Sequence, residues 1–204
     1  MDLEFEFSDD DGKILVRMAR SAVTEYLKNN IKIINEQFNS KFNKNAGVFV
    51  TINKQNSLRG CIGYPLPIKK LSDGLIDSAI AAACEDHRFL PINLNELNDI
   101  IFEVTILSSP TRINVEKFED YLSIIKLGRD GLIIENKQNT GLLLPQVPKE
   151  YGWSVEEFLN HASEKAGLEK NAWKNKYTMV SKFEGVIFKE EFPNGKVVRQ
   201  IQIF

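Results

Sequence analysis

The sequence predicts an α+β protein with a largely antiparallel sheet flanked by helices. Short apolar runs of the strand type outnumber the long patterns with helical spacing. Most of these runs are joined through short polar turns, which is typical of hairpins. Because a hairpin joins antiparallel strands, the two observations together favour an α+β fold with an antiparallel sheet.

The composition is that of an ordinary globular protein. The chain has 204 residues, of which 43% are hydrophobic and 26% are charged, and this suffices for a core without disulfides. The formal net charge of -2 provides no basic field, so we expect no nucleic-acid partner. The two cysteines, Cys61 and Cys84, form no CxxC pair, which argues against a zinc or redox motif. We expect reduced thiols, with a Cys61–Cys84 disulfide as the alternative.

The N-terminal residues do not resemble a targeting segment. Met1 is followed by the acidic stretch 2–6, without the basic and apolar regions of a secretory signal. No run approaches the roughly 20 apolar residues that a membrane helix needs. We therefore expect a cytoplasmic protein that has no membrane partner.

Three segments carry helical patterns with identifiable ends. The first spans 8–29 and begins at residues that can cap free amides. The second spans 68–84, and its alanine-rich end suits close packing on a sheet. The third opens with a capping box of Ser154 and Glu157 and stops at Gly167.

Seven segments have the composition of strands, and short polar turns join most of them. The predicted strands are 47–52, 58–62, 101–107, 132–134, 142–144, 185–188 and 197–203. The dipeptide Asn194-Gly195 predicts a type I′ turn before the last strand. That strand could instead pair at a sheet edge with a second copy of the chain, so a homodimer is the alternative to an internal hairpin.

Two segments echo each other. Residues 47–57 read GVFVTINKQNS and residues 131–140 read GLIIENKQNT, and each is followed by an apolar strand, prolines and a helical pattern. One interpretation is chance, because hairpin turns favour asparagine. The other is a duplicated strand–strand–helix unit. The duplication predicts a single domain, 1–204, with two pseudo-repeated lobes of about 1–115 and 116–204.

The segment LRGCIG at 58–63 carries the most specific chemical signal. Gly60 and Gly63 permit a close backbone approach or a positive φ. Arg59 and Cys61 are two residues apart, so regular strand geometry places them on one face. A guanidinium group there favours the thiolate, which is the nucleophilic form. The alternative is a structural cysteine, since free cysteine behaves as a small buried hydrophobe.

LRGCIG is followed by DHRFLP at 86–91, and later by LPQV at 144–147 with Glu150 and Trp153. This set resembles the AMMECR family over most of the chain, although Leu90 replaces the usual first proline of a pair. The resemblance implies a single bent, barrel-like sheet built from a duplicated unit, but no particular activity. Some prokaryotic members are fused to, or encoded with, a Memo-like dioxygenase and a radical-SAM protein, which implies a shared pathway.

The 86–91 segment supplies further candidates. Arg88 could contact an anion or a partner beside LRGCIG. The alternative is a turn interaction between Asp86 and Arg88, with Phe89 anchored in the core. The LPQV segment adds Gln146 as a candidate binding residue.

The two histidines are weak candidates for catalysis. A Cys61–His87 pair would need a separation of about 2.6–3.2 Å. A helix over 68–84 can carry the chain about 24 Å away from the strand, so we do not expect this pair. His161 reads as a partly exposed surface residue. With so few ligands, no metal or cofactor is expected.

Two functional hypotheses follow. In the first, the chain binds a small molecule or a protein partner in a cleft around LRGCIG. In the second, it is a thiol-dependent enzyme that acts on a small anionic metabolite, with Cys61 as the nucleophile and Arg59 orienting the anion. The candidate binding residues are Arg59, Gly60, Gly63, Asp86, Arg88, Phe89 and Gln146.

Overall fold

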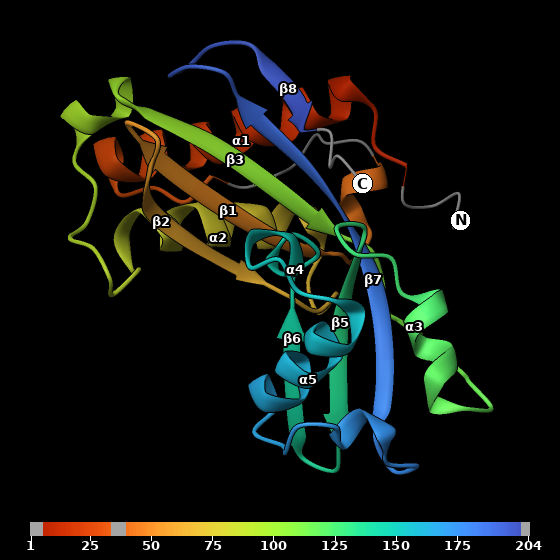
Figure 1. Cartoon of the computed structure of the whole chain (residues 1–204). Helices are drawn as coiled ribbons and strands as arrows, with labels where there is room; N and C mark the ends of the chain where they lie inside the picture. The colour runs from red at the N-terminus through yellow and green to blue at the C-terminus, as the bar shows by residue number, and fades with distance from the viewer. Residues whose placement is uncertain (1–5, 34–39, 201–204) are drawn as a thin grey trace. The chain divides into compact units, whose positions relative to one another are not determined.

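The structure is a computed structural model that describes residues 6–33 and 40–200. The chain forms two compact units, which are coloured along the sequence in Figure 1. The first unit runs to Leu107 and resumes at Val186, and the second covers Ser108–Gly185. The expected lobe boundary at about residue 115 therefore falls inside the second unit. No helix of the described residues is long and apolar enough to cross a membrane.

The first unit consists of an antiparallel sheet and two long helices. The strands follow the order β2-β1-β3-β7, and β8 pairs with β7. The elements are α1 (Asp9–Asn29), β1 (Gly47–Lys54), β2 (Ser57–Tyr64), α2 (Leu71–Cys84), β3 (Ile100–Leu107), β7 (Met179–Glu190) and β8 (Val197–Gln200), with 3-10 helices η2 (Ser40–Asn43) and η3 (Leu94–Asn98). The α+β class with an antiparallel sheet is confirmed.

The first helix is fixed at its start by side-chain capping. The Ser8 side chain accepts a hydrogen bond from the Asp11 N–H, and the Asp11 carboxylate accepts one from the Ser8 N–H. This reciprocal pair satisfies amides that have no partner within the helix. The predicted helix over 8–29 is therefore confirmed, with α1 beginning at Asp9.

The second helix begins three residues later than the sequence predicts. Lys70 has an extended backbone, with φ -57° and ψ 141°, and α2 starts at Leu71. Lys69 holds the preceding loop, because its ammonium group donates to Tyr64 Oη over 2.9 Å and to Asp77 over 2.7 Å. Helical spacing alone could not detect this side-chain bridge.

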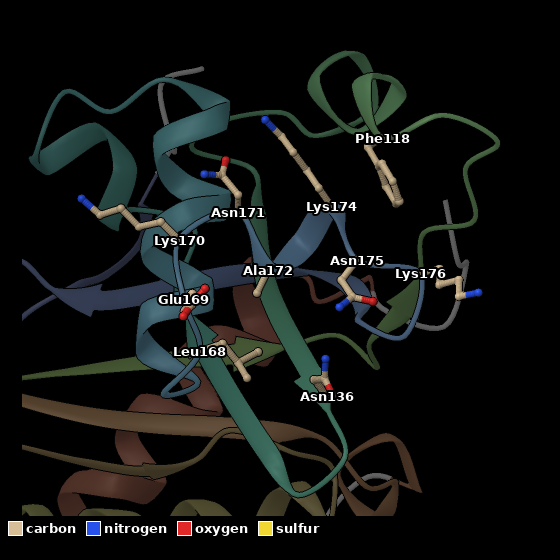
Figure 2. A pocket seen from close by; sticks show the side chains of 10 residues that line it. All are labelled: Phe118, Asn136, Leu168, Glu169, Lys170, Asn171, Ala172, Lys174, Asn175 and Lys176. Carbon is tan, nitrogen blue, oxygen red and sulfur yellow. The ribbon is translucent and has the colours of Figure 1, made fainter.

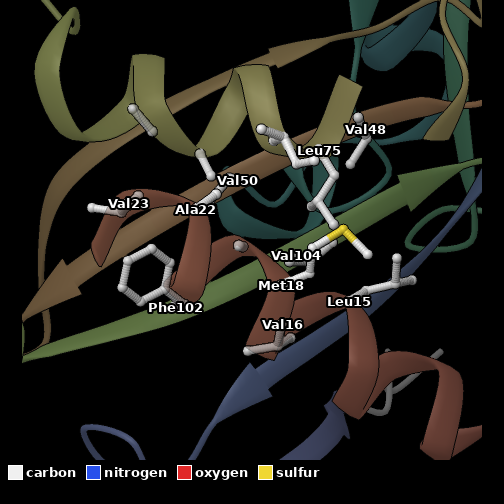
Figure 3. Packing of buried hydrophobic residues seen from close by; sticks show 14 of the residues in the cluster. Leu15, Val16, Met18, Ala22, Val23, Val48, Val50, Leu75, Phe102 and Val104 are labelled. Carbon is white, nitrogen blue, oxygen red and sulfur yellow. The ribbon is translucent and has the colours of Figure 1, made fainter. Parts of the chain in front are cut away.

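The core of the first unit lies between its helices and one face of the sheet. Figure 3 shows side chains of α1 and α2 packed on those of β1 and β3. The labelled residues are Leu15, Val16, Met18, Ala22, Val23, Val48, Val50, Leu75, Phe102 and Val104, all of them buried. Because strand side chains alternate between faces, Thr51 and Glu103 lie on the face away from these helices.

The β1–β2 hairpin contains an irregularity that shifts its register. Gln55 and Asn56 form the turn with φ of 49° and 62°, the pattern of a type I′ turn. Beyond it, Asn53 pairs with Leu58 but Ile52 pairs with Gly60, so Arg59 has no partner in β1. A one-residue bulge of this kind moves every later pair by one residue.

The second unit has its own sheet and core. Its strands are β4 (Thr111–Arg112), β5 (Asp130–Asn136), β6 (Asn139–Leu143) and the first part of β7. Its helices are α3 (Tyr121–Ile124), α4 (Val147–Glu150) and α5 (Val155–Lys165), with 3-10 helices η4 (Phe118–Asp120) and η5 (Ala172–Lys174). Phe158 and Leu159 of α5 are fully buried with Leu132 and Ile134 of β5. The predicted capping box of Ser154 is present.

The two NKQN segments form turns at different positions. In the first hairpin the turn residues are Gln55 and Asn56, whereas in the second β5 ends at Asn136 and the turn begins at Lys137. Only Lys137 of the second turn has a positive φ, of 57°. Each hairpin precedes a helix that packs on it, and the duplication stays a prediction.

The predicted type I′ turn at Asn194-Gly195 is wrong. Asn194 has a φ of 55°, but Gly195 is not in the left-handed region. The Gly195 N–H donates to the Phe192 carbonyl, so the four-residue turn starts at Phe192 and has Pro193 and Asn194 at its centre. Proline sets the φ of the second turn position, which moves the turn one residue towards the N-terminus.

A buried ion pair joins α1 to β7. Arg20 donates from Nε to Glu190 over 2.8 Å and from Nη2 over 2.5 Å. Glu190 is fully buried and also accepts the Phe102 N–H over 3.0 Å. The same guanidinium donates to the carbonyls of Leu97 and Ile100. These bonds connect the helix to three other segments of the unit.

We expect Glu190→Gln to lower the free energy of unfolding by about 3–5 kcal/mol, because it leaves the buried Arg20 guanidinium without its counter-charge. Denaturant unfolding measures this loss. The control is Glu191→Gln, which changes the exposed neighbouring carboxylate and should alter stability by less than about 0.5 kcal/mol. Equal losses in the two variants would contradict a specific role for the buried pair.

Candidate functional site

The LRGCIG segment forms most of β2, the outermost strand of the first unit's sheet. Gly60 is buried, while Arg59, Cys61 and Gly63 are half-buried. A Cβ on Gly60 would lie 2.0 Å from the Ala82 carbonyl oxygen of α2. Gly60 therefore allows the helix backbone to touch the strand, and no positive φ is involved.

The path of α2 brings the 86–91 segment back to β2. Gly74 near the start of α2 lies against Tyr64, and Ala82 near its end lies against Gly60. The helix therefore runs antiparallel to β2. The expectation that this helix carries the chain away from Cys61 is wrong, since it returns the chain along the same strand.

Asp86 and Arg88 together bind the backbone of Cys61. The Cys61 N–H donates to Asp86 Oδ2 over 2.9 Å, and Arg88 Nη2 donates to the Cys61 carbonyl over 3.2 Å. Arg88 also donates to Asp86 from Nε over 2.9 Å and from Nη2 over 2.7 Å. We call this arrangement the Asp86–Arg88 clamp. It satisfies edge-strand groups that have no neighbouring strand.

The clamp fixes the charge state of its carboxylate. The hydrogen bonds from Arg88, together with the Cys61 amide, hold the pKa of Asp86 far below its ordinary value of 3.8. The same pairing raises the pKa of Arg88. The Asp86 side chain is 3% exposed and the Arg88 side chain is 47% exposed. The clamp thus presents a cation at the surface, anchored on a buried anion.

Arg59 is directed to a different carboxylate. Its Nε and Nη2 donate to Glu96 of η3, each over 3.1 Å, and Lys54 also donates to Glu96. Arg59 is the main cause that lowers the pKa of Glu96 to about 2. The expectation that Arg59 and Cys61 share a face assumed unbroken strand alternation, which the bulge at Arg59 interrupts.

Phe89 connects the two arginines. The guanidinium carbons lie 6.0 Å from its ring centroid for Arg59 and 5.5 Å for Arg88. The ring is half-buried and does not belong to the described hydrophobic core. His87, between the clamp residues, is exposed. The structure therefore brings Arg59, Cys61, Asp86, Arg88 and Phe89 into one connected group.

Thr51 is a contact of Cys61 that the sequence did not reveal. The two residues pair across β1 and β2, and Thr51 Oγ1 lies 3.3 Å from Cys61 Sγ. The Cys61 N–H and carbonyl face the outer edge, so this is a non-hydrogen-bonded pair, in which side chains approach most closely. Both Cys61 and Cys84 are free thiols.

Gly63 and Gln146, the other two candidate binding residues, have surroundings that differ from those of the connected group. A Cβ on Gly63 would lie 2.5 Å from the Phe49 ring, so Gly63 makes room for that side chain. Gln146 belongs to the second unit, where it precedes α4, and its Oε1 is buried without a hydrogen-bond partner among residues 6–33 and 40–200. His161, also in that unit, stacks on Trp153 at 3.9 Å and pairs with Glu164.

The second unit contains a hollow of about 690 Å³. Figure 2 shows Leu168 and Ala172 near its centre, with the ammonium groups of Lys170, Lys174 and Lys176 extending outwards. Lys174 pairs with Glu156 over 2.9 Å and Lys170 with Glu164 over 3.7 Å. Two of the three lysine charges are therefore balanced locally. Among the described residues, no group of three His, Cys, Asp or Glu side chains is placed to hold a metal ion.

Comparison with known proteins places the chain in a family. The sequence matches the AMMECR1 family model over residues 16–188. The chain belongs to the AMMECR1 family. This confirms the resemblance inferred from LRGCIG and the two later segments.

AMMECR1-family relatives match nearly the whole chain. A protein of Thermococcus onnurineus is 46% identical over 202 residues, which cover 96% of this chain and 98% of the relative. A protein of Methanocaldococcus jannaschii is 45% identical over 193 residues, which cover 94% and 96%. The crystal structure of an uncharacterized protein from Pyrococcus horikoshii has a TM-score of 0.86 and 43% identity, covering 96% of this chain and 99% of that chain.

For this AMMECR1-family chain we expect the clamp to stabilise the fold only where Asp86 is ionised. The folded-state pKa of Asp86 is lowered from 3.8, so its contribution is fully present above about pH 5 and is lost as pH falls through the lowered value. The difference in unfolding free energy between the wild type and Asp86→Asn should therefore be constant near neutrality and shrink in acid. Denaturant unfolding at a series of pH values measures it.

The control for this pH series is Glu85→Gln, which removes an exposed carboxylate just before the clamp. Its stability difference from the wild type should stay near zero at every pH. A difference for Asp86→Asn that does not change with pH would contradict an ionised clamp.

Proposed function

We propose that the chain binds a small anionic molecule at the surface formed by Cys61, Arg88 and Phe89. The observation that carries this proposal is the orientation of Arg88. Its Nε and Nη2 face Asp86, so by guanidinium geometry Nη1 points away from the clamp. Nη1 has no hydrogen-bond partner among the described residues, and the side chain is 47% exposed.

The Asp86–Arg88 clamp supports anion binding because it prepares the cation in advance. Arg88 is held by hydrogen bonds to Asp86 and to the Cys61 carbonyl. Binding a ligand would therefore cost little additional side-chain ordering. Arginine also presents a planar pair of donors that suits carboxylate and phosphate groups. Arg59 is less suited, because both Glu96 oxygens accept its hydrogen bonds and its side chain is only 16% exposed.

A second candidate function is thiol-dependent catalysis on a small anionic metabolite, with Cys61 as the nucleophile. The observation that favours it is the contact of 3.3 Å between Cys61 Sγ and Thr51 Oγ1, since a hydroxyl group can stabilise a thiolate. Arg88 would then hold the anionic group next to the sulfur. In this version Arg88 takes the orienting role that the sequence assigned to Arg59.

A protein partner is the alternative occupant of this surface. Leu90 is 84% exposed beside the clamp, and Leu58 and Leu94 are also exposed. These leucines would contribute to a protein interface but not to recognition of a small anion.

The anion proposal can be tested with two alkylating reagents of similar size and different charge. The quantity measured is the rate of Cys61 alkylation by iodoacetate divided by its rate of alkylation by iodoacetamide. We expect this ratio to be higher in the folded chain than in the unfolded chain. A cation near 4 Å contributes about 1 kcal/mol in water, which is roughly a fivefold change in this ratio. Peptide mass spectrometry measures the two rates separately at Cys61 and Cys84.

The matched variants are Arg88→Gln, Arg88→Lys and Arg59→Gln. The ratio should fall to the unfolded value in Arg88→Gln, be partly kept in Arg88→Lys and stay unchanged in Arg59→Gln. An unchanged ratio in Arg88→Gln, or a loss only in Arg59→Gln, would contradict the proposal. Because Arg88→Gln also weakens the clamp, its thermal unfolding is measured alongside.

The thiol-enzyme candidate makes a separate prediction. We expect Cys61 in the folded chain to react with iodoacetamide faster at neutral pH than it does in the unfolded chain, because a catalytic nucleophile has to be activated by its surroundings. Cys84 should show the opposite behaviour, since burial raises the pKa of its thiol. A Cys61 that reacts only on unfolding would exclude this candidate.

A further inference from the structure

The Asp86–Arg88 clamp covers only part of the outer edge of β2. In an antiparallel pair, residues that bond to the partner strand alternate with residues whose N–H and carbonyl face outwards. Cys61 belongs to the outward class, because its N–H and carbonyl bond to the clamp. The register with β1 is regular from Cys61 to Gly63. Gly63, two residues further along, therefore presents its N–H and carbonyl at the same edge.

The backbone groups of Gly63 are available to a ligand. Neither its N–H nor its carbonyl has a hydrogen-bond partner among residues 6–33 and 40–200. Gly63 is half-buried, and it has no side chain that could cover the edge. An edge strand whose N–H and carbonyl are unpaired is a template for another extended backbone. This point of β2 can therefore pair with an extended ligand.

The part of the edge that can pair in this way is short. On one side, the clamp already occupies the N–H and carbonyl of Cys61. On the other side, Pro65 has no N–H to donate. The Pro65 carbonyl oxygen would lie 2.7 Å from a Cβ on Gly47 of β1, so this carbonyl is turned towards β1. A ligand would thus exchange one pair of backbone hydrogen bonds, with Gly63, which favours a short ligand.

The order of the clamp residues along the edge places a cation beside Gly63. Along the chain the N–H of a residue precedes its carbonyl, so the Cys61 carbonyl lies on the Gly63 side of the Cys61 N–H. Arg88 binds this carbonyl, whereas Asp86 binds the N–H. The guanidinium group therefore lies between the Asp86 carboxylate and Gly63, and an approaching ligand meets the cation first.

We propose that the anion bound at this site is the C-terminal carboxylate of a short extended peptide that pairs with Gly63. The inference rests on the proposed anion binding by Arg88 and names the class of its ligand. Because β2 runs from Cys61 towards Gly63, a peptide that pairs antiparallel with it runs the opposite way and ends at Arg88. A parallel peptide would instead bring its positively charged N-terminus to the guanidinium group.

The spacing of an extended chain fits this arrangement. The penultimate residue of the peptide exchanges both backbone hydrogen bonds with Gly63. The last residue follows about 3.4 Å further towards Cys61, which brings its carboxylate level with the Cys61 carbonyl that Arg88 binds. The outward Nη1 of Arg88 then donates to the carboxylate, and hydrogen bonds between two charged groups are strong. The site recognises the last two residues of the peptide.

The test is a titration of the isotope-labelled protein with N-acetyl-alanyl-alanine, followed by NMR at the Gly63 amide. We expect the Gly63 resonance to shift, and the dipeptide to bind about tenfold more tightly than acetate, because it adds two backbone hydrogen bonds. The C-terminal amide of the dipeptide should bind about tenfold more weakly than the acid, since it has no charge for Arg88. In Arg88→Gln the acid and the amide should bind equally.

N-methylated dipeptides test the backbone pairing on the unaltered protein. A methyl group on the first alanine nitrogen removes the N–H that donates to the Gly63 carbonyl and should weaken binding about tenfold. The matched control carries the methyl group on the second alanine nitrogen, which faces away from β2, and should differ by less than about twofold. Arg59→Gln should keep the preference for the acid, because Arg59 binds Glu96.

The outcomes separate this inference from anion binding itself. Equal binding of the acid and the amide by the wild type, equal effects of the two methyl groups, or no response at Gly63 would each overturn the peptide proposal. If acetate binds through Arg88 and the dipeptide binds no better, the peptide proposal fails and anion binding stands. If neither acetate nor the dipeptide binds, both fail. Thermal unfolding verifies that the arginine variants fold.

Discussion

The contact between Gly60 and the Ala82 carbonyl determines where the other site residues lie. A side chain at position 60 would collide with the α2 backbone, so glycine is what lets the helix lie directly on the edge strand. This contact fixes the end of α2 beside Cys61. The Asp86–Arg88 clamp can then bind the Cys61 backbone within four residues of the helix end.

Arginine–carboxylate pairs organise most of the shielded charge in this chain. Each of four pairs, Asp86–Arg88, Glu96–Arg59, Asp130–Arg129 and Glu190–Arg20, uses hydrogen bonds from both Nε and Nη2, so the orientation of the carboxylate is fixed. Two of the pairs, those of Asp86 and Glu96, flank the thiol-bearing strand. Fixed ion pairs therefore define the charge at the edge side of Cys61.

The family comparison extends the fold beyond one sequence. The AMMECR1-family relatives align over nearly their full lengths, and the Pyrococcus horikoshii structure has the same fold at 43% identity. The match therefore concerns the fold of both units and not an isolated motif. The names of these relatives state no activity, so the chemistry of the site is argued from the geometry of β2 and the clamp.

The sequence by itself determined the fold class, the start of α1, the hairpins and the choice of LRGCIG and 86–91 as the segments of interest. These features depend on local periodicity, capping residues and motif composition, which are present in the linear order of residues. Tertiary structure decided which side chains meet. A regular two-residue hairpin would pair Thr51 with Gly60, and only the bulge at Arg59 moves Cys61 opposite Thr51.

The same distinction explains the roles of the arginines. Sequence spacing suggested Arg59 as the neighbour of the thiol, but Arg59 binds Glu96, and Arg88 arrives at Cys61 from a segment 27 residues away. Thr51 carried no sequence signal, because its place opposite Cys61 depends on the register of the hairpin. Such pairings depend on packing between segments that are distant in the sequence, so no single segment predicts them.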